Sequence, residues 1–332
     1  MNVKGKKIFV GLSGGVDSAV SAVLLKHAGA EVTGVFIKGW YPPEMPCTWA
    51  EERRDAMRVA ARLRIPFLTL DASVEYKKSV IDYLLSEYRS GRTPNPDIMC
   101  NKEVKFGAFY RFAKERGADT IATGHYRSGG KDQSYFLWAV PKEVLETTVF
   151  PVGDMDKSEV RMIAKRYSLP VATKKDSQGV CFLGSISVEE FLRNEFGVAP
   201  GYALDEQGSV VGEHEGVLLH TLGERISLRN ALASGPWFVL EKNLETNEFV
   251  VGKTRVPMAT SLNRIPFVDE NWFQEPSNAI EAQYRYRGPR ILGSIVGSFF
   301  EYSTTLSEIP TPGQSIVFYT DDELVGGGII TA

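Results

Sequence analysis

Cysteine is scarce in this chain, and the residue spacings that hold metal ions are missing. Three cysteines occur among 332 residues, which is too few for the disulfide framework of a small secreted protein. The sequence has no Cys-x-x-Cys pair and no His-Glu-x-x-His signature. We therefore expect no structural zinc and assign no residue as a metal ligand.

Long apolar segments are missing as well. No run of eighteen or more apolar residues is present, so no membrane-spanning helix is expected. The first seven residues are basic and lead directly into an apolar strand, without the apolar segment of a signal peptide. We expect a cytoplasmic protein with no membrane partner.

An excess of positive charge is also lacking. The chain carries 38 Lys and Arg against 41 Asp and Glu, a formal net charge of −3, which gives no support for nucleic-acid binding. RNA binding would then need local basic patches. Candidates are residues 161–166 with Lys174 and Lys175, and residues 285–290, although such clusters are more often solvated surface.

The most informative stretch that is present is Ser-Gly-Gly-Val-Asp-Ser at residues 13–18. An apolar run at residues 8–12 predicts a buried strand before it, and residues 19–26 predict a helix after it. A strand, a glycine-rich turn and a helix N-terminus together present backbone N–H groups to phosphate. Asp17 can hold a metal ion beside the phosphates. The Walker pattern with its Lys-Ser/Thr ending is absent, which excludes a GTPase-type loop.

This stretch resembles the PP-loop of ATP pyrophosphatases, which split ATP into AMP and pyrophosphate. The alternative is a glycine turn with no ligand. The resemblance implies ATP, with Mg²⁺ only as its companion. The residues that we assign to ATP are Gly11, Leu12, Ser13, Gly14, Gly15, Val16, Asp17, Ser18, Ile37 and Gly124.

Later motifs narrow the choice of substrate. They are Thr-Pro-Asn-Pro-Asp-Ile-Met-Cys-Asn-Lys at 93–102, Ala-Thr-Gly-His-Tyr at 122–126, Lys-Asp-Gln-Ser-Tyr-Phe-Leu at 131–137, Phe-Pro-Val-Gly-Asp at 150–154 and Lys-Lys-Asp-Ser-Gln-Gly-Val-Cys-Phe at 174–182. Together they resemble the tRNA-specific 2-thiouridylase family, whose members replace O2 of the wobble uridine of certain tRNAs with sulfur.

The chemistry of thiolation asks for two cysteines beside the ATP site. Adenylation by ATP activates O2 of uridine, a cysteine persulfide then attacks C2 and expels AMP, and a second thiol breaks the S–S bond. By resemblance, Cys100 is the nucleophile and Cys181 carries the persulfide. A helix predicted to begin near Asn101 would favour the Cys100 thiolate. We interpret Cys47 as structural.

The resemblance also implies two partners, tRNA and a protein that delivers persulfide sulfur. It implies that Asn95, Pro96 and Asp97 contact the target base. Asp97 would either act on the uridine proton or orient the base. The remaining tRNA contacts that we assign are Lys131, Asp132, Gln133, Arg285 and Tyr286. Tyr286 either stacks on a base or packs inside a barrel, and packing is the more frequent fate of a strand tyrosine.

The order of apolar runs predicts an α/β fold followed by β-rich domains. Strands alternate with helices in the first part, which indicates a PP-loop parallel sheet with helices on both faces, its ligands at the C-terminal strand ends. Short strands then predict a small β-rich middle domain and a C-terminal β-barrel. We expect domains at 1–187, 188–258 and 259–332.

The chain departs from the family pattern at three places: the short stretch between Tyr126 and Lys131, Glu224, and residues 226–232. Two other functions stay open. One is a different PP-loop enzyme, such as an ATP-dependent ligase, which would not need both cysteines. The other is a non-catalytic protein that binds tRNA or nucleotide. The sequence does not say which tRNAs are substrates, which protein donates sulfur, or which oligomeric state is active.

Overall fold

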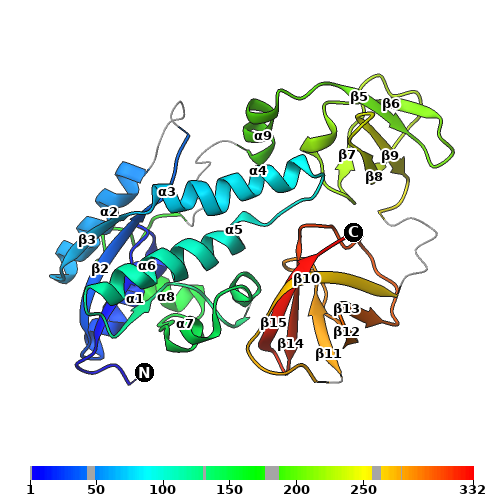
Figure 1. The fold of residues 1–332 in the computed structure, drawn as a ribbon. Helices are drawn as coiled ribbons and strands as arrows, with labels where there is room; N and C mark the ends of the chain where they lie inside the picture. The colour runs from blue at the N-terminus through cyan, green and yellow to red at the C-terminus, as the bar shows by residue number, and fades with distance from the viewer. Residues whose placement is uncertain (1, 43–48, 130–131, 176–186, 256–262, 278) are drawn as a thin grey trace. The chain divides into compact units, whose positions relative to one another are not determined.

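The computed structural model describes residues 2–42, 49–129, 132–175, 187–255, 263–277 and 279–332. The chain forms two compact units. The first comprises Met1–Ile81 and Pro96–Ser185, and the second comprises Asp82–Asn95 and Ile186–Ala332. Each unit is built around its own sheets (Figure 1).

A four-stranded parallel sheet organises the first unit, with strand order β3-β2-β1-β4. Its strands are β1 (Lys7–Gly11), β2 (Glu31–Lys38), β3 (Phe67–Asp71) and β4 (Thr120–Ala122). The helices are α1 (Val16–His27), α2 (Trp49–Leu63), α3 (Ser73–Tyr76), the π-helix η1 (Lys77–Ile81), α5 (Pro96–Met99), the π-helix η2 (Cys100–Ala108), α6 (Phe109–Glu115), the 3-10 helix η4 (Ser134–Leu137), α7 (Lys142–Thr147) and α8 (Lys157–Arg166).

Helices cover both faces of this sheet. Side chains alternate along a strand, and Ile8 and Val10 of β1 join one buried cluster with α1, α2 and α8. Gly11 therefore faces the other way. A Cβ built there would lie 3.4 Å from Phe109 of α6. The predicted fold class, a parallel sheet with helices on both faces, is confirmed.

Antiparallel β structure makes up most of the second unit. A five-stranded sheet has the order β6-β5-β9-β8-β7, and a closed barrel has the order β10-β13-β12-β11-β14-β15. The sheet strands are β5 (Gly201–Leu204), β6 (Val210–His214), β7 (Arg225–Ile226), β8 (Trp237–Asn243) and β9 (Glu248–Gly252). The barrel strands are β10 (Arg264–Trp272), β11 (Ile280–Gln283), β12 (Ile291–Val296), β13 (Phe299–Tyr302), β14 (Ser315–Thr320) and β15 (Glu323–Ile330).

The β-rich middle part and the C-terminal barrel were both predicted and are confirmed. Helix α9 (Val188–Phe196) precedes the sheet, with Ser187 accepting the amide of Glu190 as its N-cap. Between β6 and β7, Val217–Leu219 form the 3-10 helix η5. Strand β10 contains Pro266 and a charged run at 269–270, which interrupt its apolar pattern.

The segment Asp82–Asn95 belongs to the second unit although its neighbours in sequence belong to the first. It contains helix α4 (Asp82–Arg89). The Lys242 Nζ lies 3.4 Å from the Gly91 carbonyl, and the Thr93 amide donates to the Pro312 carbonyl at 2.9 Å. The predicted boundaries near 187 and 258 fall beside or within undescribed residues and stay a prediction.

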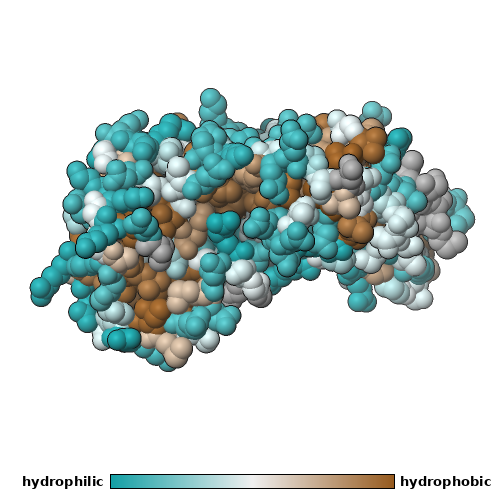
Figure 2. Space-filling view, turned by 90° about the horizontal axis from the view of Figure 1, so that it is seen from below, coloured by the Kyte–Doolittle hydropathy of each residue, from teal (hydrophilic) through white to brown (hydrophobic). Residues whose placement is uncertain are grey.

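Hydrophilic residues cover much of the face drawn in Figure 2, with apolar residues in separate patches. The most exposed large apolar side chains come from different elements: Val74, Leu232, Leu292 and Met162. Within the described ranges, no helix is both long and apolar enough to cross a membrane.

Candidate active site

The PP-loop is folded by its own serines. The Ser18 hydroxyl accepts the Ser13 amide at 3.2 Å, and the Ser13 hydroxyl accepts the Gly15 amide at 3.3 Å. Helix α1 begins directly after the loop, with Gly15 as N-cap and no side chain capping it. Its first amides therefore point out of the helix without a side-chain acceptor, which is the arrangement that binds an anion.

Two glycines allow close packing around this loop. Gly14 has φ +76°, and a Cβ there would lie 2.4 Å from the Glu52 carbonyl oxygen of α2. A Cβ on Gly124 would lie 2.8 Å from the Ser18 amide nitrogen. Any larger residue would clash with backbone at both positions. Gly124 follows β4, so the loop after β4 lies against the PP-loop.

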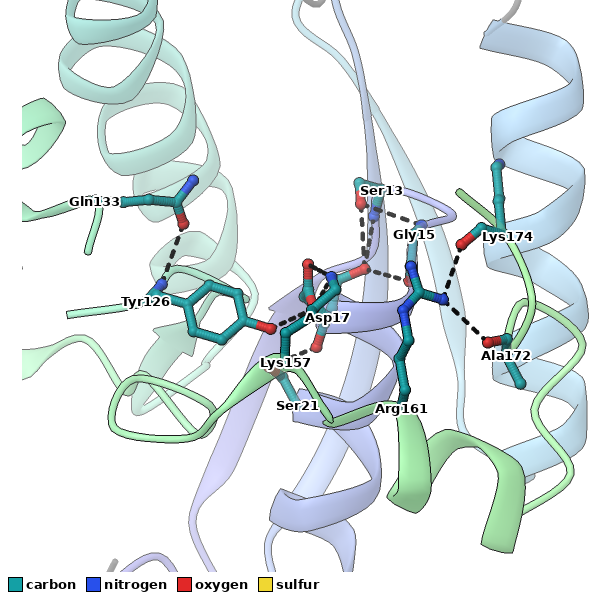
Figure 3. A network of polar contacts seen from close by, with 11 residues as sticks. Ser13, Gly15, Asp17, Ser21, Tyr126, Gln133, Lys157, Arg161, Ala172 and Lys174 are labelled. Carbon is teal, nitrogen blue, oxygen red and sulfur yellow. Dashed lines mark hydrogen bonds and ion pairs between the residues drawn. The ribbon is translucent and has the colours of Figure 1, made fainter. Parts of the chain in front are cut away.

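The Asp17 carboxylate is the centre of the polar network in Figure 3. The Tyr126 hydroxyl donates to its Oδ1 at 2.7 Å, and the Lys157 Nζ lies 2.7 and 2.8 Å from its two oxygens. The Asp17 side chain is 29 % exposed and that of Lys157 is 16 % exposed. We call these three residues the Asp17 node. It is partly open to solvent, so a ligand can reach it.

Gln133 holds the backbone of Tyr126, and Asp132 bonds to the residues that follow. Gln133 Oε1 accepts the Tyr126 backbone amide at 3.1 Å (Figure 3). The backbone amide of Gln133 donates to the Tyr126 carbonyl at 3.0 Å. Asp132 accepts both the amide and the hydroxyl of Ser134 at 2.8 and 2.9 Å. Both assigned tRNA residues thus have partners within the protein.

Cys100 lies inside a helix and not just before one. Helix α5 begins at Pro96, and the π-helix η2 continues from Cys100. Cys100 was expected at the N-terminus of a helix, where the helix dipole favours the thiolate. This expectation is wrong, because a full helical turn precedes Cys100. Cys100 is 4 % exposed. π-Helical segments are rare and occur frequently at functional sites.

The residues next to Cys100 are also buried. Asn101 donates its amide group to the Phe136 carbonyl at 2.9 Å, while its Oδ1 is buried without a partner. Burial raises the pKa of Asp97, and Lys105 opposes that shift. A carboxylate with a raised pKa is a better proton acceptor than one in water. Asn95 and Pro96 are half-buried.

The His125 imidazole lies beside two aromatic rings. Its centroid is 5.6 Å from that of Phe106 and 6.4 Å from that of Phe150. Its Nδ1 lies 2.9 Å from the Thr123 hydroxyl. Burial lowers the pKa of His125 to about 3, with a smaller contribution from Lys105. The imidazole edge keeps some accessible surface, but the rings around it disfavour the charged form, so His125 is neutral at pH 7.

In the barrel, Arg285 and Tyr286 follow β11. Arg285 pairs with Glu308 at 2.5 Å, and Arg255 pairs with the same carboxylate at 2.6 Å. Tyr284 packs in the hydrophobic core of the barrel. Tyr286 is half-buried outside this core, with the Arg287 guanidinium 5.2 Å from its ring centroid. The expectation that Tyr286 packs inside the barrel is wrong.

Other assigned residues lie outside the described ranges: Cys181, Lys131 and Cys47. Among ATP residues, Leu12 and Val16 are buried in the core of the first unit. Ile37 is half-buried at the end of β2, and its Cδ1 would lie 3.9 Å from a Cβ on Gly11.

Sequence reasoning missed Lys157 and Tyr126. A signal for Lys157 was present, because Asp156 and Glu159 form a capping box that places Lys157 in the first turn of α8. The motif at 150–154 ends just before this helix. Arg161, assigned to a basic patch, instead donates to the backbone carbonyls of Ala172 and Lys174 at 3.3 and 3.1 Å.

The low pKa of His125 gives a testable pH dependence. The unfolded chain binds a proton at His125 below about pH 6.5, whereas the folded protein does not until about pH 3. The free energy of unfolding should therefore fall as the pH is lowered from 6.5, with a slope of up to about 1.4 kcal/mol per pH unit from this group. Denaturant unfolding at pH 7, 6 and 5 should show a shallower fall in His125→Phe.

The control for this measurement is Thr123→Val, which removes the hydroxyl partner but keeps the imidazole and should keep the steeper fall. An identical pH slope in His125→Phe and the unsubstituted protein would contradict the assignment.

Three family models match consecutive parts of this chain. Residues 6–185 match the family described as "tRNA methyl transferase HUP domain", residues 189–253 match "tRNA methyl transferase PRC-barrel domain", and residues 307–330 match "Aminomethyltransferase beta-barrel domain". Among solved structures, "Crystal structure of a 4-thiouridine synthetase - RNA complex with bound ATP" resembles 57 % of this chain and 50 % of its own, with a TM-score of 0.36 and 22 % identity.

Curated relatives match almost the whole chain. The tRNA-specific 2-thiouridylase MnmA of Pseudoalteromonas translucida is 40 % identical, covering 98 % of this chain and 97 % of its own. The protein of the same name from Vibrio campbellii is 42 % identical, with 98 % and 96 % covered, and that from Shouchella clausii is 38 % identical, with 98 % and 96 % covered. The chain belongs to the tRNA-specific 2-thiouridylase family.

Proposed function

We propose that this chain is an ATP-dependent tRNA uridine 2-sulfurtransferase. The observation that carries the proposal is the Asp17 node at the uncapped N-terminus of α1, since it combines an anion site with a carboxylate. The names of the curated relatives, tRNA-specific 2-thiouridylases, support the choice of tRNA as substrate.

ATP fits the PP-loop of this structure. The first amides of α1 would receive its phosphates, and Gly14 and Gly124 leave the space that a Cβ would fill. Among the described residues, no group of three or more His, Cys, Asp or Glu side chains suits a metal ion. Asp17 would therefore hold Mg²⁺ jointly with the phosphate oxygens, and the ion would neutralise phosphate charge.

In the first step, O2 of the uridine attacks the α-phosphorus of ATP, and pyrophosphate leaves. The uridine loses its N3 proton as O2 is adenylated. Asp97 is suited to accept this proton, because burial raises its pKa above that of an ordinary carboxyl. Asn95 and Pro96 would contact the base beside it.

In the second step, the terminal sulfur of a Cys181 persulfide attacks C2, and AMP leaves. The Cys100 thiolate then attacks the Cys181 sulfur, which releases the 2-thiouridine anion to take up a proton. A Cys100–Cys181 disulfide remains, and a dithiol reductant must supply two electrons before a donor protein loads new persulfide. This requirement favours a reducing compartment such as the cytoplasm.

Further tRNA contacts are proposed for Lys131, Asp132, Gln133, Arg285 and Tyr286. Tyr286 is half-buried, so part of its ring is available for stacking on a base. Arg285 is 43 % exposed and can reach phosphate if it leaves Glu308. The internal partners of Asp132 and Gln133 favour a positioning role for these two residues.

The products of ATP give the first test of this function. With ATP labelled at the α-phosphate, tRNA and a persulfide source, the label should appear in AMP, and 2-thiouridine should be found by mass spectrometry of digested tRNA. Asp17→Ala should abolish both products. Labelled ADP would exclude the proposed activation, and AMP formed with an amine acceptor but no tRNA would favour a PP-loop ligase.

A cysteine series tests the sulfur step. Cys181→Ser should abolish thiolation but keep tRNA binding and adenylation, because its sulfur acts only after AMP is attached. Cys100→Ser should accumulate sulfur on the tRNA–enzyme adduct without releasing 2-thiouridine. Cys47→Ser is the matched control and should retain nearly full activity. Full activity of Cys181→Ser with a protein persulfide donor would show that Cys181 is not the carrier.

The salt dependence of tRNA binding tests Arg285. If Arg285 contacts one phosphate, Arg285→Ala should weaken tRNA binding and reduce the slope of log K against log salt by about 0.9. Arg255→Ala is the control, since Arg255 pairs with the same Glu308 carboxylate but has no assigned tRNA contact. An unchanged slope in Arg285→Ala would remove this residue from the interface.

A further inference from the structure

The PP-loop supplies no positive charge for the pyrophosphate group of ATP. Residues 8–18 contain neither lysine nor arginine, and their one charged side chain is Asp17. Pyrophosphate leaves with several negative charges, so a cation at this point stabilises the transition state. Backbone amides alone carry only partial charges. A cation from another part of the chain, placed beside the loop, would add to the charge that the Mg²⁺ ion supplies.

Lys157 is placed to be that cation. Its ammonium contacts both carboxylate oxygens of Asp17. Asp17 is the second residue of α1, two positions after the N-cap Gly15. The capping box of Asp156 and Glu159 fixes the turn of α8 from which the side chain starts. The Tyr126 hydroxyl shares the carboxylate and would keep Asp17 oriented if Lys157 left it. Figure 3 shows Tyr126 and Lys157 reaching Asp17 from different segments.

We propose that Lys157 exchanges partners during the reaction: it neutralises Asp17 while the site holds no nucleotide, and it pairs with the pyrophosphate group of ATP once ATP is bound. This inference rests on the proposed function, in which the site binds ATP. It adds Lys157 to the residues that contact ATP. Asp17 is then released toward the metal ion that accompanies the phosphates. The exchange keeps both side chains paired in each state, so no charge is left without a counter-charge.

The neighbouring cations are less suited to this exchange. The Arg161 guanidinium, one turn further along α8, is held by the carbonyls of Ala172 and Lys174. The Lys174 ammonium pairs with Asp55 of α2 at 2.8 Å. Lysine, in contrast to arginine, is a point charge on a flexible stem and can follow a moving anion.

Calorimetric binding of AMP, inorganic pyrophosphate and ATP, each with Mg²⁺, tests the exchange. In Lys157→Met, the affinity for pyrophosphate and for ATP should fall about tenfold or more, the effect of losing one charge-assisted hydrogen bond. The affinity for AMP should stay unchanged, because AMP lacks the β- and γ-phosphates. Lys157→Arg should retain most of the affinity. Lys142→Met, on the exposed start of α7, is the matched control.

A double-mutant cycle separates the exchange from simple charge removal. In EDTA, Asp17→Asn should bind metal-free pyrophosphate more tightly than the unsubstituted protein, because the Asp17 carboxylate then no longer competes with pyrophosphate for Lys157. This gain should be lost when Lys157→Met is added. The double variant removes the ion pair as a whole, so it also remains informative if Lys157→Met alone fails to fold.

Equal pyrophosphate affinity in Lys157→Met and the unsubstituted protein would overturn the exchange. An equal gain from Asp17→Asn in both backgrounds would also overturn it, since repulsion by Asp17 would then explain the gain. Failure of the unsubstituted protein to bind ATP or pyrophosphate would instead refute the proposed function. The two failures are thus distinguishable.

Discussion

The Asp17 carboxylate is the interaction on which the arrangement of the first unit's site depends. It joins the start of α1, the loop after β4 through Tyr126, and the start of α8 through Lys157. Tyr126 and Lys157 lie 109 and 140 residues after Asp17 in the sequence. Because one carboxylate receives both partners, a change in its state reaches both segments at once.

Contacts continue from this carboxylate toward the helical segment that begins at Cys100. Tyr126 pairs with Gln133, and η4 follows Gln133 directly. The Phe136 carbonyl of η4 accepts the amide of Asn101, the neighbour of Cys100. The PP-loop and the helical segment that carries Cys100 are thus connected through one short stretch of chain, residues 133–136.

A single lysine influences two protonation states at this site. Burial raises the pKa of Asp97 and lowers that of His125, and Lys105 lowers both. For Asp97 this favours the carboxylate, which can accept a proton. For His125 it favours the neutral imidazole, which cannot release one at pH 7.

The sequence predicted structure that adjacent residues form, and it did not predict contacts between segments far apart in the chain. The strand, glycine turn and helix of the PP-loop follow from adjacent residues, and the alternation of strands and helices predicts the parallel sheet. The partner of Asp17 could not be predicted, since the pairing with Lys157 depends on tertiary packing of α8 on α1. Cys100 was expected just before a helix that begins near Asn101, whereas Pro96 already occupies the first turn of a helix.

The chain crosses between its two units at Ile81 and again at Asn95. Helix α4 buries Leu84, Leu85 and Tyr88, and the residues after it bond to parts of the chain beyond Lys242. A fragment that ends near residue 185 would keep this helix but lose the partners of Gly91 and Thr93 in the second unit. A single cut in the chain therefore cannot separate the two units as they are built, because residues 82–95 would stay with the first piece.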